Sequence, residues 1–418
     1  MSVCVCALVL LGPSAAADAG SWKPLSHAPI DGRAFHTAVW TGEEMIVWGG
    51  SSRGKLFADG ATYDPEADRW RRISGAPLEG RTSHTAVWTG EEMLIWGGCC
   101  EQRGEEFGDG AAYDPTRDSW RPLPRAPILA RTSHTAVWTG DEMLVWGGHV
   151  FEREFADGAA YAPAEDEWRP LPKPAVEPRY SHSAVWTGAA MIVWGGATTR
   201  PSILSDGATL DRSWTRIEEA MPGRSSHTAV WTGEEMLVWG GCCGAGGTEL
   251  PGGSSYDPEA GVWRTLPPVD LGARQSHSAV WAGRRMVVWG GLTGLDKRFA
   301  DGAAFDPVRN RWFQMPATTL EARDGHTAVW TGSELVVWGG CCTGRRAFSN
   351  GAALTMASDQ ALPATAVPEG REAAPPLEPR DADFGIGAMI ALAGLILLAA
   401  LASVWAGLTR RRNREGQS

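Results

Sequence analysis

One segment of this chain, RAFHTAVWTGEEMIVWGG from Arg33 to Gly50, returns six more times in close copies. A histidine marks every copy, and successive histidines stand 45 to 50 residues apart: His36, His84, His134, His182, His227, His277 and His326. Self-similarity at this period is typical of repeat architectures, in which one supersecondary unit buries its apolar face only against its neighbours. The repeat therefore constrains the fold strongly and the ligand much less.

Charge excludes one class of partner. The 418 residues carry a formal net charge of -11, and no basic run precedes Arg410. A nucleic-acid binder needs basic surface to neutralise phosphates, so we predict that this protein does not bind nucleic acid. The 52 glycines and 22 tryptophans suit many short strands joined by tight turns.

Each repeat contains four strand candidates. In the first copy, HTAVWTG alternates and ends in a turn signal, and EMIVWGG returns as an apolar run that stops at a double glycine. After a variable loop, residues 58–65 form a third candidate ended by Asp-Pro, and a fourth surrounds Trp70. Four strands in a period of nearly fifty residues predict one blade of a β-propeller.

The chain resembles the kelch-repeat β-propeller family, in its bacterial, secreted or membrane-anchored form. That family has a double glycine closing the second strand, an aromatic residue in the third and a tryptophan in the fourth. The first copy has Gly49-Gly50, Tyr63 and Trp70, and the later copies keep the pattern except at Leu210 and Leu354, where the aromatic residue is lost. The resemblance implies an all-β propeller over residues 20–357.

The two ends of the repeat region predict how the ring closes. The seventh copy supplies three strands but no fourth-strand tryptophan, whereas Trp22 stands 48 residues before Trp70 without a repeat of its own. We therefore expect seven blades, with the N-terminal strand completing the last one. Such closure hides edge strands that an open ring would expose.

Residues that recur in every blade are interpreted as structural. Equivalent histidines in neighbouring blades should lie about 10 Å apart, too far to share one metal ion, so no metal site is predicted and each is expected to be hydrogen-bonded inside its blade. A recurring arginine and a recurring aspartate are expected to pair: Arg33, Arg81, Arg131, Arg179, Arg224, Arg274 and Arg323 with Asp59, Asp109, Asp157, Asp206 and Asp301.

Function is expected where the copies differ, in the loops after the double glycines. In a propeller these loops share one face with the loops that enter each first strand, around the mouth of the central channel. The predicted ligand-binding rim is mixed to basic and contains Arg53, Arg103, His149, Arg200, Lys297, Arg298, Arg345 and Arg346. An anionic or hydroxyl-rich ligand suits it; the alternative is a solvated rim without a ligand.

Three cysteine pairs follow the double glycines of blades two, five and seven: Cys99-Cys100, Cys242-Cys243 and Cys341-Cys342. An exported protein should have oxidised thiols, and no two pairs stand in adjacent blades. Vicinal disulfides that stiffen the loop bases are therefore expected, although adjacent Cα atoms lie closer than in ordinary disulfides. A redox or soft-metal role is the alternative.

The segments outside the repeats predict export and anchoring. Residues 1–19 resemble a signal peptide with Ala17-Asp18-Ala19 before the cleavage site, though no basic residue precedes the apolar run. Residues 358–383 are rich in Pro, Ala and Glu and are interpreted as a disordered stalk. Residues 384–408 are uncharged and long enough to span a membrane, and the basic tail at 409–418 would be cytoplasmic. A cleaved C-terminal sorting signal is the alternative.

No catalytic constellation or cofactor motif is recognisable. Kelch-like folds include a copper radical oxidase and a sialic acid mutarotase, but only Tyr180 of the five tyrosines lies outside a framework position, which argues against the oxidase. The sequence therefore predicts a single-pass cell-membrane protein whose external propeller binds a protein or glycan, without a cofactor. The alternative is a sugar-modifying isomerase, mutarotase or lyase acting at the channel mouth. Its oligomeric state is not predicted.

Overall fold

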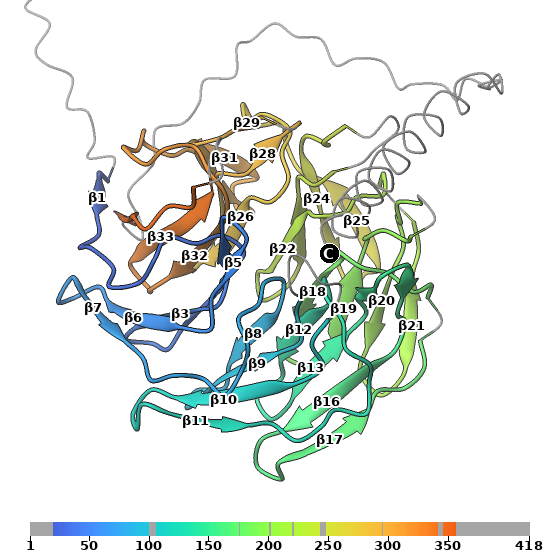
Figure 1. Cartoon of the computed structure of the whole chain (residues 1–418). Coiled ribbons are helices and arrows are strands. Elements are labelled where there is room, and N and C mark those ends of the chain that lie inside the picture. The colour runs from blue at the N-terminus through green and yellow to red at the C-terminus, as the bar shows by residue number, and fades with distance from the viewer. Residues whose placement is uncertain are drawn as a thin grey trace, which may run out of the picture. The chain divides into compact units, whose positions relative to one another are not determined.

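The computed structural model describes residues 20–99, 106–174, 176–199, 202–219, 221–242, 248–294, 296–341 and 346–356. Within them the chain forms seven four-stranded antiparallel sheets, each one blade. Blade one runs outward through β2 (Thr37–Trp40), β3 (Met45–Trp48), β6 (Gly60–Asp64) and β7 (Arg69–Arg72). The innermost strand of every blade contacts the innermost strands of both neighbouring blades, so the sheets close into a ring. The predicted seven-bladed propeller is confirmed (Figure 1).

The other blades repeat this order. Blades two to four are formed by β8 (Thr85–Trp88), β9 (Met93–Trp96), β10 (Gly110–Asp114), β11 (Ser119–Pro122); β12 (Thr135–Trp138), β13 (Met143–Trp146), β16 (Gly158–Ala162), β17 (Glu167–Pro170); and β18 (Ser183–Trp186), β19 (Met191–Trp194), β20 (Gly207–Leu210), β21 (Trp214–Ile217). Blades five and six are formed by β22 (Thr228–Trp231), β23 (Met236–Trp239), β24 (Gly253–Asp257), β25 (Val262–Thr265); and β26 (Ser278–Ala282), β27 (Arg285–Trp289), β30 (Gly302–Asp306), β31 (Arg311–Gln314).

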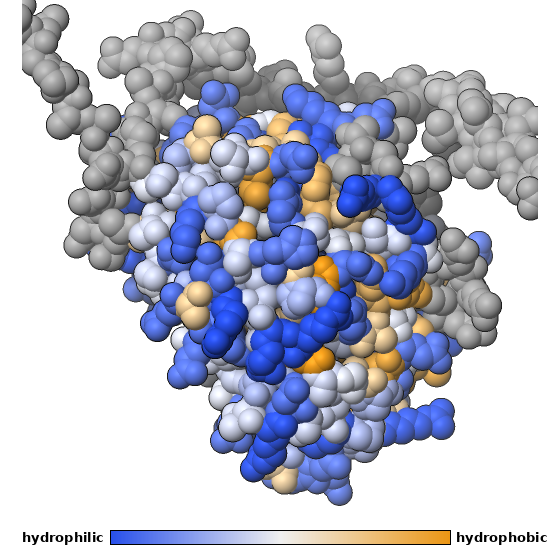
Figure 2. Space-filling view, turned by 60° about the vertical axis from the view of Figure 1, so that its left-hand side comes forward, coloured by the Kyte–Doolittle hydropathy of each residue, from blue (hydrophilic) through white to orange (hydrophobic). Residues whose placement is uncertain are grey.

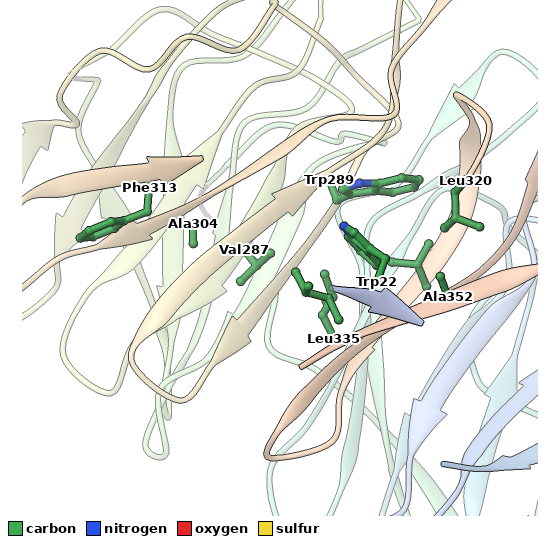
Figure 3. Close-up of a cluster of buried hydrophobic side chains, with 10 residues drawn as sticks. Trp22, Val287, Trp289, Ala304, Phe313, Leu320, Leu335 and Ala352 are labelled. Carbon is green, nitrogen blue, oxygen red and sulfur yellow. The ribbon is translucent and has the colours of Figure 1, made fainter. Parts of the chain in front are cut away.

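Blade seven combines the two ends of the repeat region. Its inner strands are β32 (Asp324–Trp330), β33 (Glu334–Cys341) and β34 (Gly351–Thr355), and β1 (Trp22–Pro24) is its outermost strand. Trp22 pairs with Leu354, so β1 completes the sheet that contains Trp338, as expected from the sequence. In Figure 1 the blue β1 lies beside the orange strands of this blade. Trp22 fills the space among Trp289, Leu320 and Ala352 (Figure 3).

The core lies between blades, which explains the continuous apolar run in each second strand. In β3, Met45 and Val47 pack toward blade seven, whereas Ile46 and Trp48 pack toward blade two. Side chains of a strand alternate between its faces, so a strand covered on both faces needs apolar residues at every position. The second-strand tryptophans are at most 1% exposed, and they fix the spacing between blades.

Three two-stranded hairpins follow the double glycines: β4 (Ser51–Ser52) with β5 (Lys55–Leu56), β14 (His149–Val150) with β15 (Arg153–Glu154), and β28 (Leu292–Thr293) with β29 (Lys297–Arg298). The predicted signal peptide, stalk, membrane helix and tail lie outside the described residues. Among the residues that are described, no helix is long and apolar enough to cross a membrane.

Candidate functional site

The variable loops are gathered on one face of the ring. The residue after each double glycine forms a backbone bridge or ladder pair with the residue after the recurring arginine, as Thr82 does with Cys99 and Thr132 with His149. The loops after the second strands therefore lie beside the segments that enter the first strands, as expected. We call this side the rim face. The turns between first and second strands lie on the opposite side, the hairpin face.

The double glycine allows two blades to meet closely. Gly97 has a φ of 71°, and an added Cβ would lie 2.6 Å from Cε1 of His134 in the next blade. Gly98 has a φ of 100°, and its Cβ would lie 2.9 Å from Cβ of His84 in its own blade. Side chains rarely adopt such φ values and would also collide here, so both positions require glycine.

The substitution Gly97→Ala is expected to lower the free energy of unfolding by about 3 kcal/mol or more, because backbone strain adds to overpacking. Gly90→Ala is the matched control, since Gly90 has a φ of 105° with no atom within 4 Å of its added Cβ. It should cost only about 1 to 2 kcal/mol of backbone strain. Urea denaturation of both variants measures the difference, and equal losses would contradict the proposed contact with His134.

A buried arginine network supports the rim face. Arg131 is fully buried and donates through Nη1 to the carbonyl oxygens of Gly147 and Asp157, at 2.9 and 3.1 Å. Its guanidinium pairs with the Asp157 carboxylate at 2.8 Å and lies 4.1 Å from the ring centre of Phe155. The predicted arginine–aspartate pairs are confirmed in five blades: Arg33–Asp59, Arg81–Asp109, Arg131–Asp157, Arg179–Asp206 and Arg274–Asp301.

The network varies in two blades. Arg323 donates to Oδ1 of Asn350 at 3.0 Å instead of pairing with a carboxylate. Gly252 stands at the aspartate position in blade five, and burial lowers the pKa of Arg224 to about 10. These guanidinium groups satisfy backbone carbonyls, and they are therefore part of the framework that carries the rim.

The recurring histidines form a second structural ring. Nε2 of His84 lies 2.9 Å from Oγ1 of Thr37 in the preceding blade, and its ring meets Trp48 edge-on with centroids 5.2 Å apart. The same hydrogen bond joins the other blades: His36–Thr327, His134–Thr85, His182–Thr135, His227–Ser183, His277–Thr228 and His326–Ser278. The expectation of a bond inside each blade was wrong, because the hydroxyl belongs to the neighbouring blade.

These histidines are neutral at pH 7. Burial, followed by the nearby Arg81 charge, lowers the pKa of His84 to about 3. The same causes act at the other six positions, where the pKa lies about 3 or well below its usual value. Within the described segments, no three His, Cys, Asp or Glu side chains are grouped to hold a metal ion.

Five predicted rim residues lie in the described part of the chain, distributed over blades one, three, six and seven. Arg53 occupies the turn of the β4–β5 hairpin with a φ of 53°, and its side chain is exposed. Lys297 in β29 and Arg346 in the loop before β34 are also exposed. Blades six, seven and one are consecutive, so these three cations occupy one sector of the rim face. Arg103, Arg200 and Arg345 lie outside the described residues.

Two rim candidates belong to the framework. Nε of Arg298 donates to Oδ1 of Asp324 at 2.5 Å, and Asp324 is 3% exposed. The ring centre of His149 lies 4.4 Å from that of Tyr180, and burial lowers the pKa of His149. Both side chains therefore hold neighbouring loops together, and neither offers an open charge to a ligand.

The predicted vicinal disulfides stay a prediction. Cys99, Cys242 and Cys341 each follow a double glycine on the rim face. Their neighbours Cys100, Cys243 and Cys342 lie outside the described residues.

The channel mouth on the rim face contains residues that sequence reasoning missed. The residue before each recurring histidine has a φ between 52° and 62°. We call these seven residues the collar: Phe35, Ser83, Ser133, Ser181, Ser226, Ser276 and Gly325. A hollow of about 280 Å³ opens among Phe35, Ser83, Ser276 and Gly325 and the histidines that follow them. The signal was present in the sequence, because serine precedes histidine in five copies and not in the first or seventh.

Two further hollows lie on the hairpin face. One, of about 550 Å³, is the other channel mouth and is lined by the Ala-Val-Trp triplets of the first strands. The other, of about 1350 Å³, is a cleft between blades two and three. The two arginines in its lining pair with carboxylates, Arg121 with Glu92 at 2.6 Å and Arg169 with Glu142 at 2.5 Å. Each of these pairs lies within one blade, whereas Arg121 also pairs with Asp166 of blade three at 3.2 Å. Most of the charged side chains that line the cleft are acidic.

The fold and this face define a class of protein, a seven-bladed propeller whose varied residues stand on a repeated arginine and histidine framework. A model of the kelch-repeats domain of KLHDC2, KLHL20 and DRC7 matches residues 17–148, 133–270 and 226–374. The chain therefore belongs to the kelch-repeat family.

Comparison with solved structures agrees on the fold. A structure described as "Structure of YjhT" is similar with a TM-score of 0.56 and 14% identity, covering 70% of this chain and 99% of that one. At this identity the likeness concerns the fold alone. No curated protein matches the sequence significantly.

Proposed function

We propose that this protein is a membrane-anchored propeller that presents its rim face outside the cell and binds a protein or glycan there. The observation that carries the proposal is that each blade combines a repeated buried framework with a varied exposed surface. The buried arginines and histidines repeat, whereas the exposed residues on the rim face differ from blade to blade. Rigid scaffolds with varied surface loops are typical of binding proteins.

The proposed location of the protein, outside the cell with one membrane anchor, rests on its sequence. The apolar N-terminal segment, the Pro-rich stalk, the uncharged stretch at 384–408 and the basic tail support export with one membrane crossing. Protease added to intact cells should remove a tag on the propeller and leave a tag after Ser418 protected. Protection of both tags would contradict this topology.

The surface chemistry favours a polar ligand on the rim face. The molecular surface in view in Figure 2 is largely hydrophilic, with apolar side chains in small separate groups. Arg53, Lys297 and Arg346 are exposed in three consecutive blades. Exposed cations attract anionic groups, and their effect on association falls as salt rises.

We expect the double variant Arg53→Glu and Lys297→Glu to weaken capture of the protein's partner at least tenfold, since two favourable charges become unfavourable. Arg117→Glu with Arg212→Glu makes the same charge change on the hairpin face and should have little effect. Binding is measured on glycan arrays and on fractionated surface proteins, with the full chain in detergent. Equal losses from both pairs would argue against the rim face.

The alternative reading, a sugar-modifying enzyme, needs proton-transferring groups at the mouth. The histidines there are buried and bonded to the neighbouring blade, and the recurring arginines are tied to backbone carbonyls. Conversion of any captured sugar, followed by NMR, would overturn the binding proposal in favour of catalysis.

A further inference from the structure

The collar departs from its own repeat at two positions that touch each other. Blade one has Phe35 and blade seven has Gly325, where the other five blades have serine. The backbone N–H of Phe35 donates to the carbonyl of Gly325 at 2.8 Å. A Cβ at Gly325 would lie 3.0 to 3.2 Å from three atoms of the Phe35 ring. The glycine therefore makes room for the phenylalanine, and the two departures form one feature.

Phe35 is held in a costly position. Its φ of 56° lies in the left-handed region, which a bulky side chain seldom adopts. Its side chain is also 45% exposed, although a large apolar side chain gains from burial. With one part of the ring against Gly325, the remainder stays open beside the hollow at the mouth. Strain and exposure together suggest that a ligand uses this ring.

The groups around Phe35 are neutral and hydroxyl-rich. Ser83 and Ser276 line the same hollow, and so do His36, His84, His277 and His326. Among the described residues, Nδ1 of these four histidines has no hydrogen-bond partner, and each side chain is 5 to 8% exposed. Burial keeps all four uncharged at pH 7. The mouth thus offers an aromatic face and the hydroxyl groups of Ser83 and Ser276, and no charged side chain in the described part of the chain lines it.

Backbone hydrogen bonds like that between Phe35 and Gly325 also join collar residues on the other side of the mouth. The N–H of Ser181 donates to the carbonyl of Ser133 at 3.1 Å, and the N–H of Ser226 donates to that of Ser181 at 3.0 Å. The residues that line the hollow belong to blades six, seven, one and two. Its volume of about 280 Å³ lies just below the roughly 300 to 1,000 Å³ of typical ligand pockets.

We propose that the hollow among the collar residues Phe35, Ser83, Ser276 and Gly325 is a subsite for one neutral pyranose unit of a glycan. The apolar C–H face of the sugar ring lies on Phe35, and its hydroxyl groups exchange hydrogen bonds with Ser83 and Ser276. This inference rests on the proposed binding function and specifies part of its ligand. It places the neutral sugar at the mouth, whereas the exposed cations of the rim face contact other groups of the same partner.

Neutral methyl pyranosides of galactose, glucose and mannose are the probes, with N-acetylneuraminic acid and glucose 6-phosphate as charged comparisons. Saturation-transfer NMR on the full chain in detergent should show saturable binding of at least one neutral probe, strongest at protons of one C–H face. The charged probes should bind at least fivefold more weakly, because the hollow has no open cation.

The matched variants restore the repeat. Phe35→Ser places the residue of five other blades, so folding should be kept, and binding of the neutral probe should fall at least tenfold. Gly325→Ser should displace the Phe35 ring and weaken binding by a similar factor, and the double variant should be no worse than Phe35→Ser alone. Ser133→Ala changes a collar residue that does not line the hollow, so this control should leave binding unchanged.

The outcomes separate this inference from the proposed function. No saturable neutral binding, full binding by Phe35→Ser, or preference for a charged probe would each overturn the collar subsite. If the rim-charge variants still lose their partner in those cases, the binding function stands without the subsite. Binding at the collar with unchanged capture by the rim-charge variants would instead remove the rim cations from the proposal.

Discussion

Acidification from pH 6.5 toward pH 3 is expected to unfold the propeller through its histidine ring. The folded-state pKa of His84, His134, His227, His277 and His326 is about 3, against about 6.5 in an unfolded chain. A pKa lowered by folding means that the unfolded state binds more protons below pH 6.5. Stability is therefore complete above pH 6.5 and is lost as the pH falls toward 3.

The expected size of this effect is large. At pH 4.5 each of these five histidines disfavours the folded state by about 2 to 3 kcal/mol, from 1.36 kcal/mol per pKa unit. Their sum is comparable with a whole domain stability of about 5 to 15 kcal/mol. Carboxylates with lowered pKa, such as Asp118 and Asp306, contribute mainly below about pH 4, where unfolded carboxylates begin to protonate.

Urea unfolding between pH 6 and 4.5 measures the number of protons taken up, from the slope of the unfolding free energy against pH. We expect a slope of about five to seven protons. His84→Gln should lower it by about one even if it also reduces stability. An uptake of only one or two protons would mean that most of the recurring histidines are already protonated or solvated in the folded state.

The fold could be predicted because the repeat leaves few alternatives. Seven copies, each with four strand candidates, predicted seven blades. Trp22, which has no repeat of its own, predicted that the N-terminal strand completes the last blade. The partner of each histidine could not be predicted in the same way, because equivalent residues in adjacent blades are indistinguishable in the sequence. Thr37 belongs to the copy before His84, and only the blade packing shows that these two residues meet.

The site was harder to predict for a related reason. Charge alone placed Arg298 among ligand-binding candidates, yet Asp324 in the next blade takes up its guanidinium. Among the seven copies, aspartate follows the recurring arginine only in the last, so no repeated pattern indicated this ion pair. Phe35 was visible in the sequence but not interpreted, because its contact with Gly325 joins the first copy to the last and depends on ring closure.

Loss of the closing strand is expected to have the second large effect. A chain that begins at Ser26 lacks β1 and therefore Trp22, which is 9% exposed and donates from Nε1 to the carbonyl of Pro316 at 3.0 Å. Trp22 also packs on Trp289 with ring centres 5.9 Å apart. Removing a buried tryptophan costs about 3 to 5 kcal/mol, and the exposed edge of β34 becomes available to other chains. We expect a lower urea midpoint and association in light scattering, relative to a chain that begins at Gly20.

Two controls connect this effect to closure itself. Lys23→Ala changes an exposed side chain of the same strand and should alter stability by no more than about 0.5 kcal/mol. A peptide with the sequence GSWKPLS, residues 20–26, should add to β34 of the shortened chain and raise its midpoint with the logarithm of peptide concentration above Kd, because it supplies the missing strand. The same peptide with alanine for tryptophan should not. A shortened chain that stays monomeric with an unchanged midpoint would show that blade seven holds the ring with three strands, and that β1 is an accessory to a ring already closed by its innermost strands.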